Sequence, residues 1–99
     1  MIRHVVVFKW NDDVTDVHVD ALSAAAAGLP EAFDTIKAFR FGRDAGLNQG
    51  NYDFAVSADF DDEAGYLVYR DHPAHQALIS AFIAGRVAQR AAVQFRVDD

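Results

Sequence analysis

The first segment of the chain, Ile2–Trp10, carries apolar residues on both of its alternating faces, and this restricts the fold more than any other feature. β-Branched and aromatic residues dominate the segment, which is typical of a strand. Val5 and Val7 point to one face, and His4 and Phe8 point to the other. Because a strand that is apolar on both faces is usually covered on both, we expect it to be central, with His4 buried or lining a cavity.

A helix is predicted over residues 14–28. Turn-forming and capping residues at 11–13 precede it, and Gly28 and Pro30 end it. Its apolar positions, which recur at helical spacing, are Val14, Ala21, Leu22, Ala25 and Leu29. The apolar stripe is narrow and rich in alanine, so this helix can approach a sheet closely.

Three further strands are predicted, over residues 35–43, 52–60 and 90–97. A glycine-rich loop, residues 42–50, separates the first two of them. Acidic residues at 61–63 favour the start of a short helix, which breaks at His72-Pro73, and a second helical segment follows as far as Gly85.

The predicted order is β-α-β-β-α-β, the ferredoxin-like pattern of an α+β protein, in a single domain over residues 1–99. It implies a four-stranded antiparallel sheet with both helices on one face. Apolar residues nevertheless occur on both faces of the sheet, at Val5 and Val7 on one face and at the alternating positions of the same strand on the other. We therefore expect a two-fold homodimer in which the uncovered sheet faces pack against each other.

Charge and composition exclude several classes of partner. The chain has 15 acidic and 9 basic residues, a formal charge of −6 and no basic stripe, so neither nucleic acid nor an anionic membrane is an expected partner. It has no cysteine and no apolar run that could span a membrane. Met1 leads directly into an alternating apolar segment without the pattern of a secretory signal, so we expect no targeting segment here. These features favour a cytoplasmic location.

The stretch Tyr69–His75 holds two of the four histidines and one of the three tyrosines. Pro73 is best tolerated in the first turn of a helix, which makes His72 the predicted N-cap and places His75 in that same turn. The partial positive charge of a helix N-terminus opposes protonation of His75, and a neutral imidazole can act as a general base. Tyr69 can face it across the bend.

The sequence also resembles a known family. The segments that carry the likeness are Ile2–Trp10 followed by Asp13, Tyr52–Phe60, and above all Tyr69-x-x-His72-Pro73-Ala74-His75. In this order they resemble the stress-responsive A/B barrel (Dabb) family. The resemblance implies a ferredoxin-like protomer and a dimeric α/β barrel, in agreement with the argument from the two sheet faces.

Family members include a plant polyketide cyclase that closes a linear polyketide by aldol condensation without a cofactor. By motif, its catalytic histidine corresponds to His75, its tyrosine to Tyr69 and its first-strand histidine to His4. That enzyme has a further histidine in the third strand, where this chain has Phe54, so the resemblance does not imply the same substrate.

We therefore predict binding of a small, apolar, carbonyl-containing molecule, with cofactor-independent acid–base chemistry such as cyclisation of a polyketide-like substrate. In this hypothesis the catalytic residues are His75 as base, Tyr69 as polarising donor and His4 as orienting group. The predicted substrate-binding residues are Phe8, Phe54, Phe82 and His72, the last also capping the helix. Two alternatives stay open: a non-enzymic stress-associated homodimer with structural histidines, and a cofactor-free monooxygenase.

The spacing of His72 and His75, with His4 nearby, also matches three imidazole ligands of a metal ion. However, no H-E-x-x-H arrangement is present and no cysteine adds a ligand. A cap position and a first-turn position also need not point together. We therefore expect no metal site and no cofactor.

Overall fold

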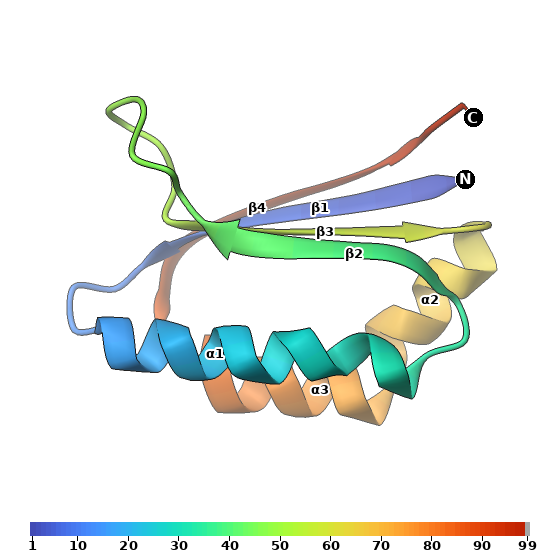
Figure 1. Cartoon of the computed structure of the whole chain (residues 1–99), viewed down its shortest axis with the longest axis horizontal. Coiled ribbons are helices and arrows are strands. Elements are labelled where there is room, and N and C mark those ends of the chain that lie inside the picture. Colours follow the sequence, from blue (N-terminus) through green and yellow to red (C-terminus); the bar gives the residue numbers. More distant parts are fainter. Residues whose placement is uncertain (99) are drawn as a thin grey trace.

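The computed structural model describes residues 1–98 and places all helices on one side of an antiparallel sheet (Figure 1). In chain order the elements are β1 (Ile2–Trp10), α1 (Asp16–Gly28), a 3-10 turn (Leu29–Ala32), β2 (Ile36–Arg43), β3 (Phe54–Phe60), α2 (Glu63–Asp71), α3 (Pro73–Leu78), a π-helical turn (Ile79–Ile83) and β4 (Val87–Arg96). The strand order is β2-β3-β1-β4. This is the ferredoxin-like arrangement, so the predicted fold class is confirmed.

The core lies between the helices and the inner face of the two central strands. Residues of β1 and β3 alternate in and out, and most of the inward-facing ones are buried beneath the helices. The inner-face residues that are buried are Ile2, His4, Val6, Phe8, Phe54, Ala58 and Phe60. His4 is therefore buried on the inner face, as the alternation of β1 predicts.

Several element boundaries differ from the predicted ones because side chains cap or close the turns. The helix starts at Asp16 instead of residue 14, since the Thr15 side chain accepts a hydrogen bond from the His18 backbone N–H at 3.4 Å. The third strand starts at Phe54 instead of residue 52, because the Asp53 carboxylate is turned to accept from the Trp10 N–H at 2.8 Å.

The last two predicted elements also change. The helical segment predicted to run from Pro73 to Gly85 keeps α-helical geometry only to Leu78, and a π-helical turn completes it with an Ala84 N–H to Ile79 carbonyl bond of 2.9 Å. The last strand starts three residues earlier than predicted, at Val87, which pairs with Trp10.

The outer face of the sheet has no helix over it (Figure 1). The register places Val5 opposite Val93 and Val7 opposite Ala91, so apolar residues gather on this face. Val93 and Phe95 are 55% and 43% exposed. An apolar sheet face left open in this way is unusual for a protein that acts as a monomer.

Charged groups border this open face. Arg3 of β1 donates two hydrogen bonds to the Asp59 carboxylate of β3, at 2.7 and 2.9 Å, and these bonds lower the pKa of Asp59. None of the helices in residues 1–98 is long and apolar enough to cross a membrane.

The fully buried ring of Phe60 provides a test of the core. We expect Phe60→Ala to lower the free energy of unfolding by about 3–5 kcal/mol, because it removes buried apolar surface and leaves a cavity. Val17→Ala is the control, since Val17 is 78% exposed on α1 and its truncation should change stability by at most about 0.5 kcal/mol. Chemical denaturation measures both; equal effects would contradict this assignment of the core.

Candidate functional site

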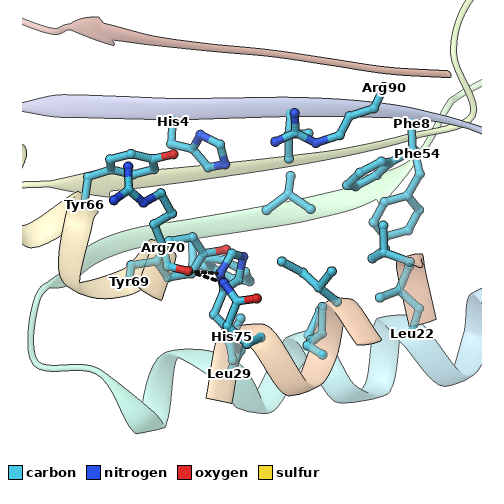
Figure 2. Close-up of a pocket in the computed structure, with 18 residues that line it drawn as sticks. His4, Phe8, Leu22, Leu29, Phe54, Tyr66, Tyr69, Arg70, His75 and Arg90 are labelled. Carbon is cyan, nitrogen blue, oxygen red and sulfur yellow. Dashed lines mark hydrogen bonds between the residues drawn. The ribbon is translucent and has the colours of Figure 1, made fainter. Parts of the chain in front are cut away.

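A cavity of about 280 Å³ lies between the inner face of the sheet and the helices (Figure 2). One end is apolar and is formed largely by Phe8, Phe54 and Leu22. The other end is lined by the imidazole, phenol and guanidinium groups of His4, Tyr66, Tyr69, Arg70 and His75. Arg90 also lines the cavity; it pairs with Phe8 on the neighbouring strand, and its side chain extends from there toward His4 (Figure 2). Such a cavity suits a small molecule with an apolar body and a polar end.

The three predicted catalytic residues come from three elements and line this one cavity. His4 lies on β1, Tyr69 on the last turns of α2 and His75 on the first turn of α3. The rings of Tyr69 and His75 have centroids 4.1 Å apart, and those of His4 and Tyr69 are 6.1 Å apart. The bend between α2 and α3 thus brings Tyr69 against His75, as the sequence analysis expects.

The hydrogen bond of His75 fixes its neutral tautomer. Its Nδ1 lies 3.0 Å from the Arg70 backbone carbonyl oxygen (dashed in Figure 2). A carbonyl oxygen only accepts, so Nδ1 carries the hydrogen and Nε2 of the neutral ring has a free lone pair. Within residues 1–98 no group hydrogen bonds this Nε2. His75 is therefore arranged to accept a proton from a molecule in the cavity.

Burial is the main cause of the lowered pKa of His75; its bond to the Arg70 carbonyl acts in the opposite direction, and the positive charge of Arg90 lowers the pKa further. This cause differs from the helix N-terminus that the sequence analysis invoked. The helix α3 spans only six residues, Pro73–Leu78, whereas His75 is partly buried beside the cavity.

His4 has the complementary tautomer. The side-chain amide nitrogen of Gln94, on the neighbouring strand β4, donates to His4 Nδ1 at 2.8 Å, so the hydrogen of the neutral ring is on Nε2. Burial, with smaller contributions from Arg90 and His75, lowers the pKa of His4 to about 4. Near pH 7 the His4 ring is thus a neutral hydrogen-bond donor.

Tyr69 stays protonated throughout the physiological range. Burial, together with the neighbouring Tyr66, raises its pKa to about 12. Its side chain is 3% exposed and packs against His75 and Phe60. Since no hydrogen bond of its hydroxyl is formed within the described part of the chain, this group is available as a donor to a bound molecule.

Of the four predicted substrate-binding residues, the structure brings Phe8 and Phe54 to the cavity and leaves His72 and Phe82 outside its lining. His72 caps α3, accepting from the Ala74 N–H at 3.0 Å through its Nδ1, and its ring packs against Phe33. Its predicted capping role is thereby confirmed.

The position of Phe82 follows from the π-helical turn. The extra residue in this turn changes the helical spacing that aligned Phe82 with His75 in the sequence. In the structure the Phe82 ring packs beside His18, whose Nε2 lies 2.9 Å from the Phe82 carbonyl oxygen. Phe82 therefore contributes to the core between α1 and the π-helical turn.

Sequence reasoning missed Tyr66, Gln94 and Arg90 as residues of this site. Gln94 and Arg90 alternate with apolar residues on β4, and a hydrophobic pattern draws attention only to the latter. Their pairing partners in β1 are His4 and Phe8, so the strand register was the signal that would have placed them here. No cluster of three or more His, Asp or Glu side chains that could hold a metal ion occurs among residues 1–98.

Comparisons with known proteins agree with this fold. A dimeric ferredoxin-like protein of unknown function from Thermobifida fusca YX is 49% identical, with a TM-score of 0.91 over 97% of this chain and 90% of that chain. A stress-response A/B barrel domain-containing protein of Arabidopsis thaliana is 33% identical over 86 residues, or 83% of this chain and 74% of that protein.

A hydroxynitrile lyase from Passiflora edulis shares the fold, with a TM-score of 0.84 and 16% identity over 99% of this chain and 94% of that chain. The family model described as the stress responsive A/B barrel domain matches residues 2–97, which is nearly the whole chain. The chain therefore belongs to the stress responsive A/B barrel domain family.

Proposed function

We propose that this protein binds a small, apolar, carbonyl-containing molecule in the cavity and moves a proton on it without a cofactor. The observation that carries the proposal is the pair of neutral imidazoles with complementary tautomers, His75 as acceptor and His4 as donor. Removing a proton next to a carbonyl group needs a base at the carbon and a donor at the oxygen. One cavity holds both groups.

In the proposed reaction, Nε2 of His75 takes a proton from the carbon next to the carbonyl. The electron pair of the broken C–H bond moves to the carbonyl oxygen, which accepts hydrogen bonds from His4 Nε2–H and the Tyr69 hydroxyl. The resulting enolate either takes the proton back on its opposite face or at another atom, which isomerises the substrate, or attacks a second carbonyl of the same molecule. In the latter case a C–C bond forms, and the His75 imidazolium returns the proton to the new alkoxide.

The apolar end of the cavity supports this choice of substrate class. Phe8 and Phe54 are 6% and 2% exposed and lie beside Leu22, so this end offers only hydrocarbon surface to a ligand. Exclusion of water from it would strengthen the hydrogen bonds at the polar end. A cyclisation of polyketide-like type fits these properties.

We also propose that the protein is a homodimer formed through the open outer face of the sheet. Two such faces would cover Val93 and Phe95, which the protomer exposes. The similar Thermobifida fusca protein is described as dimeric. In this assembly the two sheets form the dimeric α/β barrel and the helices lie outside.

Proton exchange tests the chemistry without knowledge of the natural substrate. In D₂O, we expect the protein to accelerate deuterium incorporation next to the carbonyl of 4-phenylbutan-2-one, and His75→Gln to reduce the protein-dependent rate by about 10²–10⁴-fold. The rate is read by NMR. His18→Gln is the control, since His18 is a histidine outside the cavity lining and should leave the rate unchanged.

A protein that binds this ketone but exchanges no protons, and whose His75→Gln variant only loses stability, would contradict the catalytic proposal. The histidine would then be structural, and the protein would be a binding dimer without enzymic activity.

The pH dependence provides a second test. Since the pKa of His75 is lowered from 6.5, the base is neutral at pH 7, and the exchange rate should fall only when the pH drops below 6.5. An NMR titration of the imidazole should give the same midpoint as the rate. Tyr69→Phe should shift this midpoint, because the two rings are in contact. A free-imidazole titration that ignores Tyr69→Phe would refute the coupling.

Light scattering tests the dimer. We expect the wild-type protein at micromolar concentration to have twice the 10.9 kDa protomer mass, and Val93→Glu to give monomers, since it places a charge in the middle of the proposed interface. Val17→Glu makes the same chemical change on the exposed side of α1 and should remain dimeric. A monomeric wild-type protein would overturn this assembly.

A further inference from the structure

The charge of the cavity is opposite to that of the chain. The whole chain carries a formal charge of −6, with 15 acidic residues. Among residues 1–98 no acidic residue lines the cavity, whereas two arginines, Arg70 and Arg90, do. This segregation leaves the cavity as an electropositive compartment in an acidic protein.

The two arginines differ in their partners. Arg70 donates to the carboxylate of Asp71 from Nε and from one terminal nitrogen, at 2.8 and 3.1 Å, so its charge is balanced locally. Arg90 has neither an ion pair nor a hydrogen bond with any group in residues 1–98. Its five N–H donors are available to a bound molecule.

Arg90 is also placed to meet a ligand. It lies on β4 in register with Phe8, and its side chain extends along the sheet over the cavity toward His4 (Figure 2). Its charge reaches both imidazoles, since it contributes to the lowered pKa of His4 and of His75. A group that binds Arg90 would therefore lie in the same cavity as the two histidines.

From this arrangement we propose that the ligand is an anion, an apolar keto acid whose carboxylate is bound by Arg90 while its carbonyl group lies between His4 and His75. This inference rests on the proposed function and narrows its substrate class from carbonyl compounds to keto acids. A planar guanidinium matches a carboxylate with two parallel hydrogen bonds, which gives orientation as well as affinity.

Binding the carboxylate at Arg90 would also orient the reacting group. The anion fixes one end of the molecule at Arg90, and the tail enters the apolar end between Phe8 and Phe54. The carbonyl group can then meet the imidazoles, because the Arg90 side chain extends toward His4 (Figure 2). Removal of Arg90 should therefore weaken binding of acids and leave binding of neutral molecules unchanged.

Two isosteric probes separate charge from shape: octanoate and octanamide. We expect wild-type protein to bind octanoate roughly ten-fold more tightly than octanamide, the effect of a charge-assisted hydrogen-bond pair. Arg90→Gln should abolish this preference while octanamide binds as before. Arg43→Gln is the matched control, because Arg43 pairs with Asp20 at the surface and does not line the cavity. Affinities are measured by NMR titration of cavity resonances.

The outcomes distinguish this inference from the proposed function. If both probes bind equally well to wild type and to Arg90→Gln, the cavity binds apolar molecules but the keto-acid inference is wrong. If neither probe shifts a cavity resonance, both proposals fail. If Arg43→Gln also loses the preference for octanoate over octanamide, the preference depends on the net charge of the protein. This result would overturn the role of Arg90. A thermal melt confirms that each variant is folded.

Discussion

The bend at His72-Pro73 is the constraint on which the site depends. In an unbroken helix, residues 69 and 75 would lie ~9 Å apart along the axis and on different sides of it. Pro73 cannot continue α2, since it has no N–H to donate and its ring clashes with the preceding turn. His72 therefore adopts an extended conformation and caps α3. The chain bends at this point, and the ring centroids of Tyr69 and His75 come to lie 4.1 Å apart.

The same residue type has two roles here because each imidazole has a different partner. A backbone carbonyl forces the hydrogen of His75 onto Nδ1, whereas an amide donor forces that of His4 onto Nε2. Burial keeps both rings neutral, and Arg90 reinforces this. The positive charge of Arg90 would bind the carboxylate of an anionic ligand. The same charge helps to keep His75 unprotonated before the ligand binds, so these two proposed roles of Arg90 are compatible.

The residues that could be placed correctly from the sequence are those whose positions follow from strand alternation or from a proline. The inward direction of His4 followed from the period of β1, and the cap at His72 followed from Pro73. The sequence analysis did not place Arg90 or Gln94, because β4 is an edge strand on which nearly every residue is exposed and no apolar period marks its inner face. Phe82 was aligned with His75 for a different reason. The prediction assumed α-helical spacing, whereas a π-helical turn at Ile79–Ile83 changes that spacing, and no residue type in the sequence indicates such a turn.

The edge strand β4 links the site to the proposed assembly. Its alternate residues serve two surfaces: Arg90 and Gln94 belong to the cavity, while Ala91 and Val93 lie on the outer face with Val5 and Val7 of β1. In the protomer, β4 pairs with β1 alone and is covered on neither face. Packing of a second sheet against its outer face would restrict its motion, and thereby hold the amide that fixes the tautomer of His4. The proposed dimerisation and the preorganisation of the site therefore both depend on β4.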